Sequence, residues 1–367
     1  MSFQRIVAKL GTSTLTAGTP HLSPPRIVEL VRQMSELRAA GREVILVTSG
    51  AIAAGRAHLG FPQLSGDIPA KQMLAAVGQP RLMSLYEQLF GLYGVLVAQV
   101  LITRADISDR RRYLNSRGAL LALLAHHILP IVNENDTVAT EEIRVGDNDN
   151  LSALVANLVE ADLLILLTDQ PGLLTANPRR DPTATLIRDV TSPDIPDELW
   201  RAAGGTGTGL GVGGMFTKVQ AADLARRSGA TVIIARGSDP DILSRIVSGE
   251  PLGTRFSPVT TVESRKRYLL AGVAAPGCIQ VDPGAAAALR ASGSLLPVGV
   301  QSITGAFDRG DVVRVVDPAG REIARGLTNY ADADLLRIRG KQSQEIETLL
   351  GYTFADEVIH RNNMVLL

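Results

Sequence analysis

Short apolar runs alternate with amphipathic segments from residue 5 to about residue 236. The runs that we predict to be strands cover residues 5–9, 43–48, 95–101, 128–133, 162–168 and 231–236. Several of them, such as residues 44–47 and 163–167, are continuously apolar, which favours strands buried on both faces. Amphipathic helices are expected at residues 24–41, 109–126 and 148–160. This alternation predicts an α/β fold, with a mainly parallel sheet between two layers of helices.

The pattern changes towards the end of the chain. Residues 237–275 are rich in proline and less periodic, and short strands with Gly and Pro turns follow. Residues 311–326 predict a hairpin around Asp317-Pro318-Ala319-Gly320. The chain is therefore predicted to divide into an α/β domain at 1–255, a linker at 256–275, a small β-rich domain at 276–354 and a C-terminal tail at 355–367.

Composition excludes several classes of protein. A chain of 367 residues exceeds what one core usually organises, and its 37 basic residues balance 37 acidic ones. The single cysteine, Cys278, forms no internal disulfide, and the five histidines show no zinc-binding spacing. No apolar stretch approaches the length of a membrane span. We therefore expect a soluble cytoplasmic protein with no metal ion held by its own side chains, in which any anion site is local.

Two predicted strands end in groups that suit an anion. Lys9 ends the first and precedes Gly11-Thr12-Ser13, whose backbone and hydroxyl groups could bind phosphate. The second strand ends in Thr48-Ser49-Gly50, a turn into a helix start, where free N–H groups favour a carboxylate or phosphate. A solvated strand end and a simple helix cap explain these features equally well.

The most distinctive segment is rich in Asn and Asp. Asn133-Glu134-Asn135-Asp136 follows a predicted strand, and Asp147-Asn148-Asp149-Asn150 leads into a predicted helix. Turn formation alone would not require so many short amides and carboxylates together. Because ligands of such sheets bind at the carboxyl ends of the strands, these side chains are candidates to bind an amino acid or to hold a lysine.

Two further segments suit a nucleotide. Thr168-Asp169 ends another apolar run, although Asp before a Pro-Gly turn is also common where no ligand binds. Residues 204–218 are dense in glycine and end at Lys218, which could neutralise phosphates, while a flexible linker would have the same composition. No P-loop motif is present, and no predicted strand precedes the Gly-x-Gly-x-x-Gly pattern, so a dinucleotide fold is not expected.

Together these segments resemble the amino acid kinase family, and within it the branch that acts on free glutamate. The matching stretches are residues 9–13, 47–55, 133–136, 145–153, 167–170 and 213–218. The resemblance implies the three-layer α/β fold, a C-terminal PUA domain, and ATP-dependent phosphorylation of the L-glutamate side-chain carboxylate as the first step of proline synthesis. It also implies Mg²⁺ bound through the nucleotide, inhibition by proline, a homo-dimer or homo-tetramer, and hand-over of the product to glutamyl phosphate reductase.

By the same resemblance, roles fall on particular residues. Those implied to bind glutamate are Ser49, Gly50, Asp136 and Asn148. Those implied to bind ATP are Lys9, Thr168, Asp169, Val212, Gly213, Gly214, Met215, Phe216, Thr217 and Lys218. Lys9, Lys218 and Asp149 would be catalytic, with the two lysines flanking the transferred phosphoryl group and Asp149 holding both in place. The chain departs from the family loop at Val212, where a threonine is common, and at Phe216 after Met215.

The chemistry of such a reaction agrees with these residue types. A carboxylate substrate is already ionised at pH 7 and needs no general base. It repels the γ-phosphoryl oxygens, so catalysis depends on positioning and on neutralisation by lysine and Mg²⁺.

Two other functions remain open from the residues. A sister kinase acting on aspartate, acetylglutamate or a nucleoside monophosphate would use the same fold and lysines. A PUA domain suggests RNA binding, and it would contain Arg314, Arg321, Arg325, Arg337, Arg339 and Lys341. The neutral overall charge makes RNA the less favoured partner.

Overall fold

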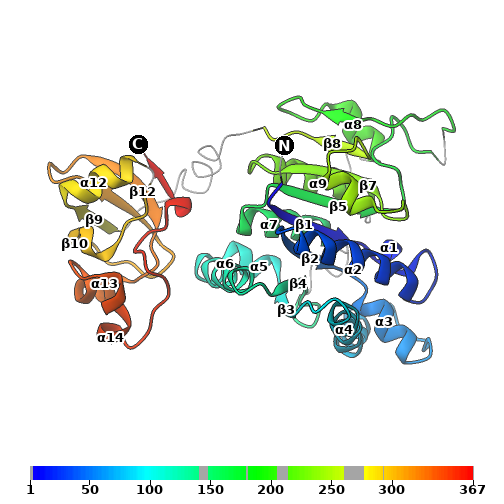
Figure 1. Cartoon of the computed structure of the whole chain (residues 1–367), viewed down its shortest axis with the longest axis horizontal. Helices are drawn as coiled ribbons and strands as arrows, with labels where there is room; N and C mark the ends of the chain where they lie inside the picture. Colours follow the sequence, from blue (N-terminus) through cyan, green and yellow to red (C-terminus); the bar gives the residue numbers. More distant parts are fainter. Residues whose placement is uncertain are drawn as a thin grey trace. The chain divides into compact units, whose positions relative to one another are not determined.

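The computed structural model describes residues 3–139, 148–178, 181–204, 214–259, 277–291 and 293–366. Some of the predicted features fall outside the described residues: Val212 and Gly213 of the glycine-rich segment, residues 140–147 before Asn148, and residues 260–275 of the linker. The chain forms two compact units, the first made mainly of residues 1–260 and the second mainly of residues 261–367 (Figure 1). The exact domain limits given above stay a prediction.

A mainly parallel sheet organises the first unit. Its strands are β1 (Arg5–Leu10), β2 (Glu43–Thr48), β3 (Val97–Ile102), β4 (Leu129–Glu134), β5 (Leu163–Thr168), β6 (Asp189–Val190), β7 (Thr231–Arg236) and β8 (Thr254–Phe256). Their order in the described part of the sheet is β3-β4-β2-β1-β5-β7-β8-β6, and only β8 runs antiparallel to its neighbour β7. All six predicted strands are present within two residues of their expected limits.

Helices connect the strands and cover the sheet. Their bounds are α1 (Thr12–Thr16), α2 (Pro24–Ala39), α3 (Ala51–His58), α4 (Ile68–Gly91), α5 (Arg104–Ser108), α6 (Arg110–Ala125), α7 (Asn148–Val159), α8 (Asp197–Ala202), α9 (Met215–Arg226) and α10 (Ile242–Val247). Helices α2, α4 and α10 share one core cluster with alternate residues of β1 and β2. Helices α7 and α9 pack together and against β1, β5 and β7. The predicted three-layer fold is confirmed.

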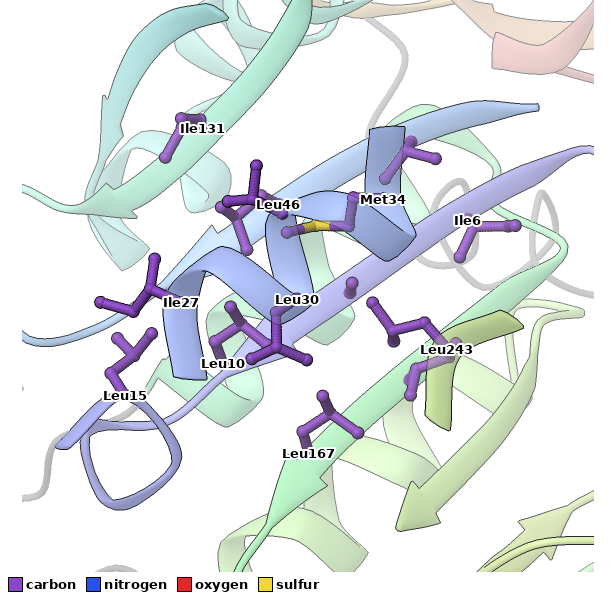
Figure 2. Close-up of a cluster of buried hydrophobic side chains, with 14 of the residues drawn as sticks. Ile6, Leu10, Leu15, Ile27, Leu30, Met34, Leu46, Ile131, Leu167 and Leu243 are labelled. Carbon is purple, nitrogen blue, oxygen red and sulfur yellow. The ribbon is translucent and has the colours of Figure 1, made fainter. Parts of the chain in front are cut away.

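The core explains why several strands are continuous apolar runs in the sequence. Alternate residues of a strand point to opposite faces, and both faces of β1 are covered, so Ile6 and Val7 are equally inaccessible to solvent. Figure 2 shows Ile27 and Leu30 of α2 near Leu10 of β1, and Met34 of the same helix belongs to the same buried cluster. Burial of each such side chain contributes about 1.5–3 kcal/mol. This core holds the carboxyl ends of the strands in a fixed arrangement.

Two glycines let helices α3 and α4 approach each other closely. A Cβ atom on Gly55 would lie 1.9 Å from the carbonyl oxygen of Leu74, and one on Gly78 would lie 1.8 Å from that of Ala51. Neither distance is possible without a shift of backbone, because the obstacles are carbonyl groups rather than flexible side chains. The contact therefore fixes α3, whose first residues follow the candidate site residues Ser49 and Gly50.

Gly78→Ala is expected to destabilise the protein by about 3 kcal/mol or more, through overpacking against the backbone of Ala51. Gly91, at the end of the same helix, serves as the control, because a Cβ atom added there would meet no described neighbour within 4 Å beyond its own stretch of helix. Gly91→Ala should leave stability unchanged or raise it slightly, since alanine has the higher helix propensity. Urea denaturation of both variants measures the difference, and equal midpoints would show that α3 and α4 can separate freely.

The second unit is a small β-rich domain with its own core. Its sheet has the order β10-β9-β11-β12-β13 among the described residues. The elements are β9 (Gly277–Val281), α12 (Pro283–Arg290), β10 (Val300–Thr304), β11 (Val312–Val316), β12 (Glu322–Leu327), α13 (Asp332–Ile338), α14 (Ile346–Leu350) and β13 (Met364–Leu366). Strands β11 and β12 form the predicted hairpin, and the Asp317 carboxylate accepts the backbone N–H groups of Ala319 and Arg321 at its turn.

Local contacts occupy part of the basic surface of this unit. Arg321 pairs with Asp317 at 2.8 Å, and Arg325 pairs with Glu322 at 2.5 Å. Arg337 donates to the backbone carbonyl of Leu349. The two ion pairs leave less unpaired charge for a nucleic-acid backbone than the sequence alone suggests.

Candidate active site

A cavity of about 740 Å³ opens at the carboxyl ends of β1, β2 and β4. The predicted site residues that line it are Lys9, Ser49, Gly50, Asp136, Asn148, Asp149, Gly214 and Lys218. They come from separate segments of the first unit, so the fold brings together side chains more than 200 positions apart in the chain. The position agrees with the general rule that α/β sheets bind ligands at strand ends.

Asp149 lies between two lysines beside this cavity. Its Oδ1 atom is 2.5 Å from Nζ of Lys9, and its Oδ2 atom is 3.2 Å from Nζ of Lys218. Lys9 and Asp149 are only 4% and 3% exposed. Lys9 is therefore not a solvated strand end, and its charge is neutralised by a carboxylate carried on a different element. The arrangement places two ammonium groups next to one cavity around a single buried anion.

The charge of Asp149 is maintained by its neighbours. Burial alone would raise its pKa, but the positive charges of Lys9 and Lys218 and the hydrogen bonds from Lys9 and Thr217 lower it to about 2. Thr217 donates from Oγ1 to Oδ2 of Asp149 at 2.7 Å. Asp149 is therefore ionised at every pH near neutrality.

Helix α9 carries Lys218 from the end of the glycine-rich segment. The helix begins at Met215, two residues before the expected start at Thr217. Gly214 precedes it with φ of 146°, a value that favours glycine, and its N–H donates to Oγ1 of Thr217 at 3.3 Å, while that Oγ1 lies 3.0 Å from the Gly214 carbonyl. Nζ of Lys218 also lies 3.3 Å from that carbonyl. The helix start is thus tied to the same Asp149 that holds Lys9.

A network of amides lines another part of the cavity. Nδ2 of Asn148 lies 2.9 Å from the Thr48 carbonyl, 2.8 Å from Oγ of Ser49 and 3.0 Å from Oδ1 of Asn133. Its own Oδ1 atom is buried and accepts no hydrogen bond from the described residues. Because buried acceptors are rarely left unpaired, this oxygen is suited to accept a hydrogen bond from a ligand.

Asp136 is the third acidic candidate and has a different environment. Burial raises its pKa to about 6, and no neighbouring cation among the described residues opposes that effect. A carboxylate that is partly desolvated and lacks a cation attracts one strongly. Asp136 is therefore suited to bind an ammonium group of a ligand.

A second cavity, of about 320 Å³, borders the first at Gly214. Three of the residues implied to bind ATP line it, namely Asp169, Gly214 and Met215. Thr168 is buried and donates from Oγ1 to Oδ1 of Asp169 at 3.0 Å. Phe216 instead packs its ring against that of Trp200, with ring centroids 5.5 Å apart. Val212 and Gly213 lie outside the described residues.

The sequence did not indicate several residues of the two cavities. The residues missed in the larger one include Thr16, Thr19, Ile52, Ala53, Arg56 and Phe61, and those in the smaller one include Leu173, Asn177, Pro178 and Ala203. The helical period could have found Arg56, since it lies four residues after Ile52 on α3. The residues after β5 follow a Pro-Gly turn and carry no chemical signal of their own.

Among the described residues, no group of three His, Cys, Asp or Glu side chains is placed to hold a metal ion. A magnesium ion needs fewer protein ligands than that when it arrives with a nucleotide, since phosphate oxygens and water fill most of its coordination sphere. The described helices also contain none that is long and apolar enough to span a bilayer.

Comparison with known proteins agrees with the fold. Residues 4–236 match the amino acid kinase family, and residues 277–350 match the PUA domain. The chain belongs to the amino acid kinase family and ends in a PUA domain.

Three of its close relatives share one name. Glutamate 5-kinase of Photobacterium profundum is 56% identical over 366 residues, which cover 99% of this chain and 96% of that protein. The enzyme of the same name from Vibrio campbellii is 54% identical over 366 residues, with the same coverage. That of Herpetosiphon aurantiacus is 54% identical over 363 residues, which cover 98% of each chain.

Proposed function

We propose that this protein is a glutamate 5-kinase, which transfers the γ-phosphoryl group of ATP to the side-chain carboxylate of L-glutamate. The observation that carries the proposal is the pair of lysines held by Asp149 beside a cavity lined with amides and a partly buried carboxylate. Two cations at this point would offset the repulsion between a carboxylate nucleophile and a triphosphate. The near-complete match to relatives of that name supports the choice of glutamate.

The glutamate end of the cavity would be formed by β2, β4 and α7. Asp136 would bind the α-ammonium group, and the unpaired Oδ1 of Asn148 would accept one of its hydrogen atoms. Ser49 and Gly50 precede helix α3, whose first N–H groups favour a carboxylate. These contacts would orient the substrate so that its side-chain carboxylate lies towards Lys9.

The nucleotide would enter from the other side of β1. Its adenosine would occupy the smaller cavity beside Asp169 and Met215, and its phosphates would pass Gly214 towards Lys218. Magnesium would come with the nucleotide and neutralise part of the phosphate charge. Helix α9 starts at this point, so its N-terminal N–H groups also favour the phosphates.

The reaction itself requires no base. A side-chain carboxylate oxygen of glutamate attacks the γ-phosphorus, the bond from that phosphorus to the bridging oxygen of ADP breaks, and the electron pair leaves with ADP. The products are ADP and an acyl phosphate. Lys9 and Lys218 would stabilise the charge that develops on the transferred group, while Asp149 keeps both ammonium groups in place.

Trapping with hydroxylamine tests the proposal directly, because hydroxylamine converts an acyl phosphate to a stable hydroxamate. The purified protein with Mg²⁺-ATP should form hydroxamate with L-glutamate and not with L-aspartate or N-acetyl-L-glutamate. ADP release dependent on UMP would identify a nucleoside monophosphate kinase instead. Activity on one of these substrates without activity on glutamate would keep the family and overturn the substrate.

Asp136→Asn should reveal the role of the carboxylate through its pH dependence. In the wild type, kcat/KM for glutamate should fall below about pH 6, where Asp136 becomes protonated in the free protein and loses its attraction for the ammonium group. At pH 8 the kcat/KM of the variant should be about 10–100-fold lower than that of the wild type. The fall of kcat/KM near pH 6 should be absent from the variant. The free energy of unfolding of the variant should be higher than that of the wild type above pH 6. The raised pKa of Asp136 means that its ionised carboxylate destabilises the folded wild type there, by roughly 1–3 kcal/mol.

The two effects together separate ligand binding from structural damage. Thermal unfolding at pH 8 should show the variant to be at least as stable as the wild type. Near pH 4 the two proteins should have the same stability. A variant that loses both activity and stability at pH 8 would contradict this assignment of Asp136.

The remaining parts of the proposal rest on chemistry and on the family resemblance. Proline carries the same α-carboxylate and α-amino groups as glutamate, so we expect it to inhibit by competing for the same cavity. A homo-dimer or homo-tetramer, a cytoplasmic location and hand-over of the unstable product to glutamyl phosphate reductase are also expected. Raised glutamate concentration should relieve inhibition by proline if the two ligands share the cavity.

A further inference from the structure

One cation that lines the larger cavity has no partner in the described part of the chain. Arg56 lies in α3 and is exposed, and its side chain makes no hydrogen bond, ion pair or ring contact with any described residue, while its backbone carbonyl accepts the N–H of Phe61. The other basic residues among the described lining are Lys9 and Lys218, and both are close to Asp149. Arg56 is thus the basic side chain on this lining whose charge Asp149 does not offset.

Helix α3 presents two faces with different surroundings. Ala51 and Gly55 lie against α4, where the two glycines described above allow close backbone contact. Ile52, Ala53 and Arg56 line the cavity together with Ala51, and Arg56 lies three residues after Ala53 and four after Ile52, a spacing that places it beside both on the helix surface. Side chains on a helix lean towards its N-terminus, and Ser49 and Gly50, which precede α3 at that end, line the same cavity as Arg56.

The order of the strands places Arg56 at the glutamate end of the cavity. Helix α3 follows β2, and β2 lies between β4, which leads to Asp136, and β1, which carries Lys9. The proposed nucleotide residues follow β5 and precede α9, on the other side of β1. Arg56 therefore shares its side of the sheet with Asp136, away from the second cavity.

We propose that Arg56 binds the α-carboxylate of glutamate and thereby selects substrates that carry two carboxylates. This inference rests on the proposed function. Glutamate has one ammonium and two carboxylate groups, and the lysines around Asp149 would serve only the carboxylate that reacts. A guanidinium matches the second carboxylate in charge and can bind it through two parallel hydrogen bonds. With Asp136 on the ammonium group, the cavity would then contact each charged group of the substrate.

Substrate analogues can isolate this contact. L-Isoglutamine keeps the reacting carboxylate and the ammonium group but has a neutral α-amide, and 4-aminobutanoate lacks the α-carboxylate altogether. Hydroxamate formation would be measured with both and with L-glutamate, for the wild type, Arg56→Gln and Arg56→Lys. Arg81 provides a matched control, because it is an exposed arginine on α4 that contacts His58 of α3 without lining the cavity.

Arg56→Gln should lower kcat/KM for glutamate about 10–100-fold, mainly through KM, and change the values for both analogues less than threefold. Arg56→Lys should lie between the wild type and Arg56→Gln, since it keeps the charge but loses the paired hydrogen bonds. Arg81→Gln should behave as the wild type with all three substrates.

Other outcomes would overturn the inference. An equal loss with glutamate and the analogues would show that Arg56 supports the structure of α3, and unchanged values would show that it is a solvated side chain. A wild-type protein that forms no hydroxamate with glutamate would overturn the proposed function, and this inference with it. In contrast, normal wild-type activity with no change of discrimination in Arg56→Gln would reject the inference alone.

Discussion

Lys218→Ala is expected to lower kcat for glutamate phosphorylation by ~10²–10³-fold, with much smaller changes in KM for either substrate. The charge of Lys218 should contribute more to stabilising the transition state than to binding the substrates. Lys218 already contacts Asp149 and the Gly214 carbonyl, so we expect it to contribute little to binding of the ground-state carboxylate. Its ammonium group is needed most when negative charge is spread over the oxygens of the phosphoryl group in transit.

Steady-state hydroxamate assays with each substrate varied in turn would separate kcat from KM. Lys71→Ala is a suitable control, since Lys71 lies on α4 and does not line either cavity. The thermal unfolding temperature of both variants should stay close to that of the wild type, because Asp149 keeps its contact with Lys9. Unchanged turnover in Lys218→Ala would show that this lysine does not contact the transferred group.

The fold was largely predictable because its signal is repeated in each unit of strand and helix. Burial of both sheet faces makes residues 44–47 of β2 and 163–167 of β5 continuously apolar, and that property is visible in any one strand. Helix α4 was not predicted, since Gly78 and Pro80 interrupt its pattern in ways that usually end or bend a helix. Gly78 is explained only by the close contact with α3, which is a property of the tertiary structure.

The site was predictable to the extent that its residues follow strands. Lys9, Ser49 and Asp136 stand after apolar runs, so their position at one edge of the sheet follows from the fold class. Whether Lys9 is buried or solvated could not be decided from its neighbours, because its partner Asp149 lies 140 residues away. Arg56 carries no chemical signal of its own in the sequence, and only its helical spacing from Ile52 and the cavity distinguish it from an ordinary surface arginine.

Asp149→Asn should have the largest effect on stability and should also reduce turnover. Removing the buried anion leaves Lys9 with its charge uncompensated in an inaccessible position, which is expected to lower the free energy of unfolding at pH 7 by about 3–5 kcal/mol. The folded-state pKa of Asp149 lies below its unfolded value of 3.8, so its stabilising effect is complete above pH 3.8 and disappears as the pH falls towards 2. The difference between variant and wild type should therefore shrink below about pH 4.

Urea denaturation between pH 3 and pH 8 would test this dependence. Asp194→Asn provides the contrast, because Asp194 pairs with Arg227 at 3.0 Å but its side chain is 88% exposed, and exposed pairs contribute little. Turnover of Asp149→Asn should fall at least as far as that of Lys218→Ala, since neither lysine would then be held in place. A stability loss that is constant from pH 3 to pH 8 would mean that the side chain acts by shape or hydrogen bonding, and that its charge does not stabilise the two lysines.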